Sequence, residues 1–281
     1  MKACTISVGG IAGLAANIST SSGSLVVPNG SNSVNVIFKD CDNTGLVYNC
    51  GMNYSTSSSS SNKSFAGGLV GTLTGNSGEK MASLVNCTNK GDVIPYDVTT
   101  EDVEVPSARP AYCSVAGGLV GFGGYVRMEG CTVKCRIGNG KRLVASLGGA
   151  IGFNVRPFII KGCSVYFDGY FQRITGYKMN RSVLVTVPVK YTGGSAMALA
   201  PDVKGSEISG CRGGATLLTN VNTVINADFD KDRSDLTKKG TYTTTIFNDS
   251  SSAMGYLVCG EQFSLNPEEV TLSDNTFWMG I

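Results

Sequence analysis

The chemistry open to this chain is limited first by the absence of histidine. The 281 residues include ten cysteines and 21 acidic residues but no histidine. An imidazole base for a serine or cysteine nucleophile, zinc sites with histidine ligands and haem held by histidine are therefore excluded. Thiols, carboxylates and glycine-rich loops remain as the groups that could carry a reaction or hold a ligand.

Thiols could hold a metal only at the spacing of a metal site. Cys131 and Cys135 are separated by three residues, the spacing in this chain that comes nearest to a zinc-ligand pair. A structural zinc site needs four ligands, and no second pair follows at the spacing of a zinc finger. Residues four positions apart in a strand share one face. We therefore interpret both as core cysteines, and we predict no metal site and no cofactor.

One acidic segment resembles the opening of a calcium-binding loop. It runs from Asp228 to Asp235. An EF-hand would need a glycine where Arg233 stands and a bidentate acid where Lys239 stands. We therefore interpret this segment as a solvated polar loop.

Paired carboxylates could hydrolyse a glycosidic bond if the fold held them about 5 to 9 Å apart. Asp40 and Asp42 lie two positions apart, whereas Asp92 and Asp168 stand far from them and from each other in the sequence. Because the acids are scattered, we predict no catalytic residues and a protein that is not an enzyme. A polysaccharide lyase or hydrolase on the same fold is the alternative.

Nucleotides and nucleic acids are disfavoured as ligands. The phosphate-loop pattern Gly-x-x-x-x-Gly-Lys-Ser/Thr is absent. Charged residues make up 16% of the chain, the formal net charge is +2, and no long basic run occurs. Nucleic-acid binding relies on neutralising phosphates with Lys and Arg, so we expect none here.

The many glycines belong to a block that recurs along the chain. Its pattern is two glycines, two apolar residues and a third glycine, and its copies are Val8–Gly13, Ala66–Gly71, Ala116–Gly121, Leu147–Gly152 and a worn copy at Thr192–Ala198. Such a block is a poor helix, because each glycine costs about 1 kcal/mol relative to alanine. We expect short strands whose glycines lie at corners or where neighbouring backbones approach closely.

A second block, built around a cysteine, follows each glycine block. Its cysteines are Cys41, Cys87, Cys131, Cys163 and Cys211. The first two copies read Cys-x-Asn-x-Gly, which predicts a strand start with an inward cysteine and then an Asn–Gly turn. Stacking of the copies would place these cysteines in an interior row. Buried thiols act as small apolar groups and need not be bridged.

The two blocks together predict an all-β fold, a single-stranded right-handed parallel β-helix (β-solenoid) over residues 1–218. No segment of twelve residues shows a convincing helical stripe, and crossovers between parallel strands are almost always right-handed. Residues 219–281 show no clear copy of either block. We expect them to form a C-terminal cap, because the end of a solenoid exposes strand edges and core. Phe277 and Trp278 are interpreted as an apolar plug there, with a carbohydrate-stacking platform as the alternative.

The Gly-Gly-Leu-Val-Gly and Asn-Cys-x-Asn-x-Gly blocks resemble the GLUG-type repeats of bacterial cell-surface and adhesin-like proteins, especially those of gut anaerobes. The resemblance covers about residues 6–215, and the best copies are Ala66–Val93 and Ala116–Cys131. It implies a β-solenoid exposed outside the cell, at the cell surface and associated with the outer membrane. It carries over no catalytic residues.

We therefore expect a secreted, non-catalytic protein of the adhesin or structural type, whose partner is a glycan or a surface protein. A phage-tail or filament component is a further alternative, and the oligomeric state stays open. No transmembrane segment is expected, because the apolar stretch Ile6–Ala16 is short and broken by three glycines. This stretch is also a poor signal peptide, so we expect that a leader has been removed or that the chain starts within a longer protein. Segments 55–64 and 95–110 are interpreted as exposed loops.

Overall fold

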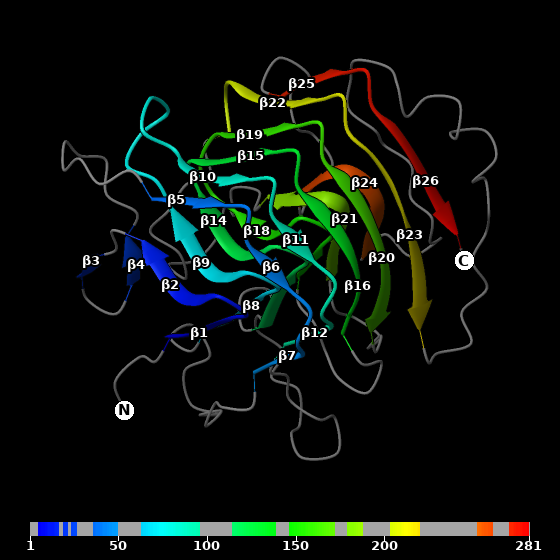
Figure 1. The fold of residues 1–281 in the computed structure, drawn as a ribbon, viewed down its shortest axis with the longest axis horizontal. Coiled ribbons are helices and arrows are strands. Elements are labelled where there is room, and N and C mark those ends of the chain that lie inside the picture. The colour runs from blue at the N-terminus through cyan, green and yellow to red at the C-terminus, as the bar shows by residue number, and fades with distance from the viewer. Residues whose placement is uncertain are drawn as a thin grey trace.

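The computed structural model describes residues 5–16, 19–21, 24–26, 36–49, 63–95, 114–138, 146–171, 179–187, 203–219, 252–260 and 270–280. Within these residues all regular structure is β-strand, arranged in three parallel sheets (Figure 1). The antiparallel pair β3 (Ser19–Ser21) and β4 (Ser24–Val26) lies apart from them. The prediction of an all-β chain is confirmed for the described residues. The right-handed helix and the cap stay predictions.

Sheet I consists of two rows of strands, and the glycine block connects one row to the other. The first row is β1 (Thr5–Gly9), β8 (Lys63–Gly67), β13 (Ser114–Gly117), β17 (Ser146–Gly148), β21 (Met179–Val187) and β24 (Ser252–Gly260). The second row is β2 (Ala12–Ala16), β9 (Val70–Thr74), β14 (Val120–Gly124) and β18 (Ile151–Asn154), and it also ends on β21. The copies of the block lie in register, so that Ala66 pairs with Val8 on one side and with Ala116 on the other.

Each cysteine of the cysteine block lies between a strand of sheet II, which precedes it, and a strand of sheet III, which follows it. Sheet II is β5 (Ile37–Lys39), β10 (Ala82–Val85), β15 (Val126–Glu129), β19 (Phe158–Lys161), β22 (Ser206–Ser209) and β25 (Val270–Ser273). Sheet III is β6 (Asp42–Asn43), β11 (Thr88–Asn89), β16 (Thr132–Ile137), β20 (Ser164–Phe171), β23 (Arg212–Thr219) and β26 (Thr276–Gly280), extended by β7 (Val47–Tyr48) and β12 (Val93–Ile94).

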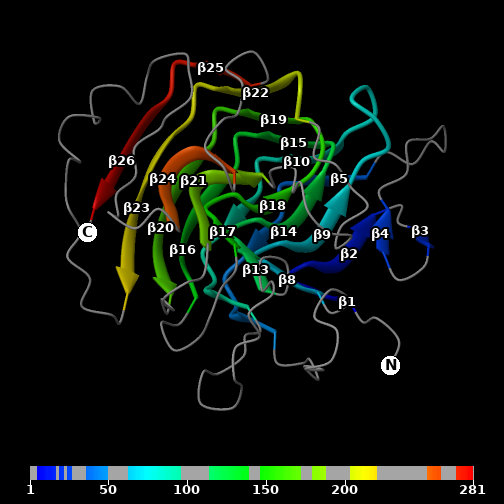
Figure 2. The same cartoon turned by 180° about the vertical axis from the view of Figure 1, so that it is seen from behind.

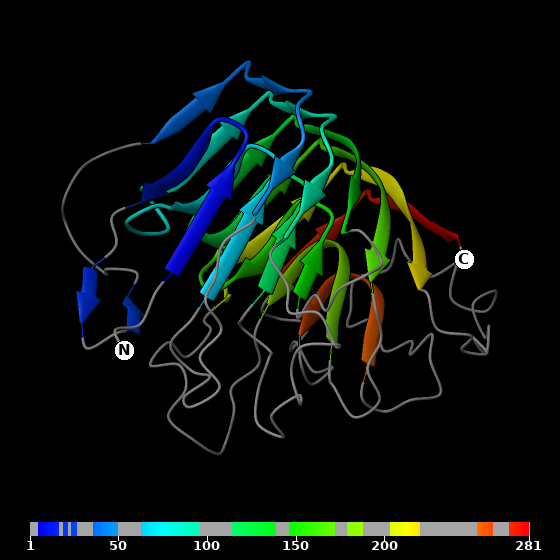
Figure 3. The same cartoon turned by 90° about the horizontal axis from the view of Figure 1, so that it is seen from below.

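In the described residues the chain visits sheets I, II and III in this order six times. We term each visit a passage; the first contains β1 to β7 and the sixth β24 to β26. Figure 2 shows the strands of neighbouring passages side by side, and Figure 3 shows the first and the sixth passage at opposite ends of the stack. Residues far apart in the sequence thus become neighbours: Asn43 and Asn89, 46 positions apart, are joined by a hydrogen bond of 2.8 Å.

The main core fills the space between the three sheets. Sheet II contributes a row of in-register apolar side chains, namely Phe38, Leu84, Met128, Ile160, Ile208 and Leu272. A second cluster lies on the other face of sheet I, where the rings of Phe65 and Phe122 are 4.8 Å apart and those of Phe122 and Phe153 are 6.2 Å apart. Sheet I is therefore buried on both faces.

The first glycine of the block makes the sharp corner between the two rows of sheet I. A Cβ on Gly117 would overlap the carbonyl oxygen of Val120, and a Cβ on Gly148 would overlap that of Ile151. Only glycine, which has no Cβ, fits where two backbone segments approach each other so closely. The prediction of glycine at corners and close approaches is confirmed here.

The second glycine of the block packs closely against a side chain of the cysteine block. A Cβ on Gly68 would overlap the side chain of Asn89, and one on Gly118 would lie 2.7 Å from Cγ1 of Val133. Both partners stand two positions after the cysteine of their own passage. Because glycine has no side chain, it leaves room for the side chain that stands two positions after the cysteine.

In each passage, the chain turns from sheet II to sheet III at a residue with a left-handed backbone conformation. These residues, each with φ between 52° and 61°, are Asp40, Asn86, Gly130, Gly162, Gly210 and Asp274. Glycine, asparagine and aspartate are the residues that adopt this conformation at lowest cost. The sixth corner precedes Asn275, which occupies the place of the cysteine. This copy lacks the cysteine and is therefore not apparent in the sequence, and the boundary between 1–218 and 219–281 stays a prediction.

Candidate functional site

The cysteines of the cysteine block form a row inside the molecule. Cys87, Cys131 and Cys163 are fully buried, Cys211 is 1% exposed and Cys41 is half-buried, and all are free thiols. Their side chains point inward, as the sequence predicts. Each directly follows the left-handed residue at its corner and lies close to backbone carbonyls of sheet II.

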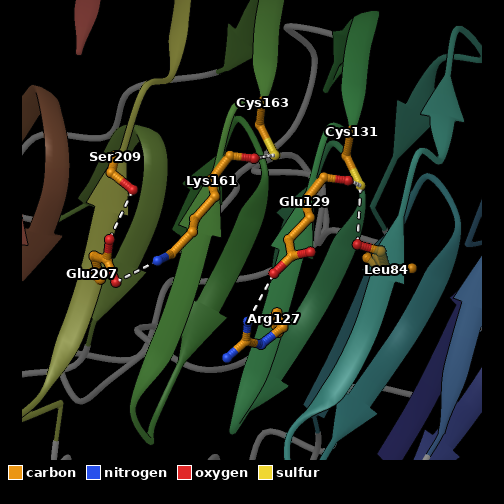
Figure 4. A network of polar contacts seen from close by, with 8 residues as sticks. All are labelled: Leu84, Arg127, Glu129, Cys131, Lys161, Cys163, Glu207 and Ser209. Carbon is orange, nitrogen blue, oxygen red and sulfur yellow. Dashed lines mark hydrogen bonds and ion pairs between the residues drawn. The ribbon is translucent and has the colours of Figure 1, made fainter. Parts of the chain in front are cut away.

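The thiols donate hydrogen bonds to these carbonyls. Cys131 Sγ lies 3.5 Å from the carbonyl oxygen of Glu129 in its own passage and 3.4 Å from that of Leu84 in the passage before (Figure 4). Asn275 reproduces the second contact with its amide, which donates to the carbonyl oxygen of Ile208 at 2.9 Å. A small side chain with one donor suffices at this position, so we assign the row a structural role.

Burial keeps the thiols of Cys87 and Cys135 protonated near neutral pH, whereas the hydrogen bond with Cys163 lowers the pKa of the Cys131 and Cys211 thiols. Desolvation raises the pKa of the Cys87 thiol from 9.0 to about 11 and that of the Cys135 thiol to about 12. A protonated thiol is a poor nucleophile and a poor metal ligand. In the described part of the chain no three Cys, Asp or Glu side chains lie close enough together to hold a metal ion. The calcium-like segment 228–235 lies outside the described residues.

The raised pKa of Cys87 predicts a loss of stability in alkali. The unfolded chain releases this proton at a lower pH than the folded chain, so the stability is intact below pH 9.0 and falls as the pH rises from 9.0 towards about 11. Cys87→Ala removes this titration. Its free energy of unfolding should fall less steeply than that of the wild type, by up to about 1.4 kcal/mol per pH unit.

Urea unfolding at pH 8 and near pH 10 measures this difference. Cys41→Ala serves as the matched control, because it removes a half-buried thiol from the same row. Parallel losses of stability in the wild type and in Cys87→Ala would contradict the assignment.

Two acids that are far apart in the sequence lie on either side of one arginine on the outer face of sheet III. Asp92 Oδ1 accepts the backbone N–H of Arg136 at 3.0 Å, and its Oδ2 lies 3.9 Å from Nε of the same residue. Arg136 in β16 pairs in register with Asp168 in β20. The interpretation of these acids as scattered is therefore wrong for Asp92 and Asp168, which flank one arginine.

An exposed tyrosine lies in the next row of the same face. Tyr166 in β20 is 38% exposed and pairs in register with Lys134 in β16. On its other side it pairs with Gly214, which in turn pairs with Trp278 in β26. The side chain of Trp278 lies outside what the structure describes, whereas Phe277 is 5% exposed and belongs to the main core.

We define the sheet III patch as Asp92, Lys134, Arg136, Tyr166 and Asp168. The signal that could have revealed it is the offset from the cysteine. Lys134 and Tyr166 both stand three positions after the cysteine of their passage, and Arg136 and Asp168 both stand five positions after it. Because the strands lie in register, equal offsets place side chains next to each other.

Asp40 and Asp42 do not join this patch. Asp40 lies at the left-handed corner, where its Oδ1 accepts a hydrogen bond from the side-chain amide of Asn86 at 3.3 Å. Asp42 lies in β6 and pairs in register with Thr88. Both belong to the first passage, whereas the patch extends over the second, third and fourth.

The outer face of sheet II carries ion pairs in which each charged side chain already has a partner of opposite charge. Arg127 lies 2.7 Å from Glu129, and Lys161 lies 2.9 Å from Glu207, whose other partner is Ser209 (Figure 4). The hydrogen bond from Lys161 lowers the pKa of the Glu207 carboxyl. Exposed pairs of this kind contribute at most about 1 kcal/mol each, so we interpret this face as structural.

Comparison with known proteins returned no match to any protein-family model, to any curated protein or to any solved structure. No helix in the described residues has the length and apolar character needed to cross a membrane. The GLUG resemblance therefore stays an expectation drawn from the sequence.

Proposed function

We propose that this chain is a single-stranded right-handed parallel β-helix that acts, without catalysis, as a secreted adhesin-like protein and binds glycans through the sheet III patch. The helix is supported by six passages through the same three sheets with in-register parallel pairs. Right-handedness rests on the strong preference of parallel crossovers. A secreted, surface-exposed location rests on the resemblance of the glycine and cysteine blocks to GLUG-type repeats.

The single observation that carries glycan binding is Tyr166 among charged groups. Tyr166 is 38% exposed on the outer face of a parallel sheet. An aromatic ring offers an apolar face on which the CH face of a sugar can stack, while its hydroxyl remains available for hydrogen bonding. Arg136 donates hydrogen bonds and Asp168 accepts them, so the two can bind sugar hydroxyls beside the ring.

Tyr166→Ala is the variant that tests this proposal. A glycan array identifies a ligand of the wild type, and calorimetry then measures its affinity for both proteins. Loss of the stacking face should weaken binding at least about tenfold, which corresponds to about 1.4 kcal/mol. Tyr48→Ala is the matched control, because Tyr48 is an equally exposed tyrosine (42%) in the first passage. An array without any bound glycan, or equal losses in both variants, would reject the proposal.

A polysaccharide-degrading enzyme is the second candidate, and the placement of Asp92 and Asp168 on either side of one arginine favours it. Carboxylates on one face are what glycoside hydrolysis requires. Incubation with a panel of polysaccharides, with Asp168→Asn as the variant, separates the two functions. Cleavage that Asp168→Asn abolishes would establish the enzyme. Binding without cleavage supports the adhesin.

A further inference from the structure

Large apolar side chains that are exposed to solvent gather in the first passage. They are Ile11 (46% exposed), Leu14 (58%), Ile37 (61%), Leu46 (62%) and Tyr48 (42%). Among the described residues of the later passages, Tyr166 is the only other large apolar side chain with comparable exposure. The concentration in one passage marks an interaction surface rather than the scattered exposure found on any protein.

Two of these positions are fully buried in the second passage. Ile11 corresponds to Leu69, which is fully buried in the main core, and Leu14 pairs in register with the fully buried Thr72. A preceding passage covers these positions in the second passage, and no described strand covers them in the first. Among the described residues, the first passage is therefore the end of the stack at which these positions are exposed.

The strands of the first passage also present unpaired backbone groups. β1, β2, β5 and β6 each have a neighbour on one side only. In the second passage the N–H of Thr88 donates to the carbonyl of Cys41, and in the third the N–H of Thr132 donates to that of Cys87. Asp42 stands at the same position in the first passage, where no described strand offers it a carbonyl. Such an edge is a template for another strand.

Hydrogen bonds between asparagine side chains of successive passages end at Asn43. Asn89 Oδ1 accepts two hydrogen bonds, one from the N–H of Gly91 and one from Asn43 in the passage before. Among the described residues, Asn43 Oδ1 accepts one, from the N–H of Gly45. A carbonyl oxygen has two acceptor sites, so Asn43 retains one for a donor that meets this edge.

We propose that two copies of this chain meet through their first passages and form a symmetric dimer. A twofold axis brings the same surface of each copy together. With the axis at the corner of Asp40 and Cys41, β5 of one copy runs antiparallel to β6 of the other. Lys39 then faces Asp42 of the second copy, so that the exposed charges at this corner attract across the interface.

In the sixth passage β25 and β26 also have a neighbour on one side only, but none of the side chains described there is a large apolar group exposed to solvent. Its core side chains Val270, Leu272 and Phe277 are only 9%, 5% and 5% exposed. Exposed apolar side chains in the first passage, with none among those described in the sixth, favour a closed pair over an open filament. This dimer is independent of the glycan-binding function and leaves the sheet III patch of Tyr166 facing solvent.

Sedimentation equilibrium from about 1 to 100 µM tests the dimer with four variants. Ile11→Lys and Leu46→Lys place charges on the first passage and should raise the dimer dissociation constant at least tenfold. Tyr166→Lys and Thr271→Lys change equally accessible positions in the fourth and sixth passages and should leave it unchanged. Thermal melts followed by circular dichroism confirm that each variant is folded.

Three results would overturn the proposal. The first is a wild type that stays monomeric at all concentrations. The second is a dimer that resists both Ile11→Lys and Leu46→Lys while these variants remain folded. The third is a mass that grows with concentration and is cut by Thr271→Lys, which would show head-to-tail assembly.

Discussion

Replacing Asn89 with alanine is expected to lower the free energy of unfolding by about 4 kcal/mol. Asn89 is fully buried and makes four hydrogen bonds. Its amide donates to the carbonyl oxygens of Gly91 and Gly118, both at 2.9 Å, and its Oδ1 accepts from Asn43 and from the N–H of Gly91. Each group left without a partner in the core costs about 1 to 3 kcal/mol.

The effect should be large because Asn89 connects three passages. Its partners Asn43, Gly91 and Gly118 belong to the first, second and third passages. Urea unfolding of Asn89→Ala against the wild type measures the loss. Thr88→Ala is the matched control, since Thr88 is the half-buried neighbour in the same strand and should change the stability by less than about 1 kcal/mol. Similar losses in both variants would contradict a special role for the buried amide.

Replacing Gly117 with alanine should cost about 3 kcal/mol, because the added methyl group would overlap the backbone of Val120 and Gly152. A backbone atom cannot move aside as the end of a flexible side chain can, so the corner of sheet I must open. Thermal or urea unfolding measures the loss.

Gly78→Ala is the control for the general effect of a glycine replacement. Nothing lies within 4 Å of a Cβ at Gly78, and the residue is exposed. This variant should change the stability by less than about 1 kcal/mol, with a slight gain expected from the stiffer unfolded chain. If Gly117→Ala were as well tolerated as Gly78→Ala, the close approach at the corner would not exist in solution.

The parts of the fold that could be predicted are those that depend on neighbours in the sequence. The Asn–Gly turn after the cysteine is confirmed, since Asn43 Oδ1 accepts the N–H of Gly45 and Asn89 Oδ1 accepts that of Gly91. In the third passage Val133 stands at this position, and β16 runs on without a turn. The presence or absence of one asparagine thus decides whether the chain bends.

Other features depend on contacts between passages, which the sequence pattern does not reveal. Phe65 and Phe122 lie in strands too short and too rich in glycine to show a period, so their cluster on the outer face of sheet I left no pattern to detect. The proximity of Arg136 and Asp168 becomes apparent only when the third and fourth passages are aligned on Cys131 and Cys163. The candidate site was therefore missed although each residue was visible.

The stacking of passages in register has a mechanical consequence. Hydrogen bonds between passages run along the axis that joins the first passage to the sixth, and each passage is bonded to its immediate neighbours. Tension applied along that axis loads these bonds a few at a time instead of shearing a whole sheet at once. Under such a load the passages would separate one after another from an end. The chain that each separated passage releases would lower the force on the next passage.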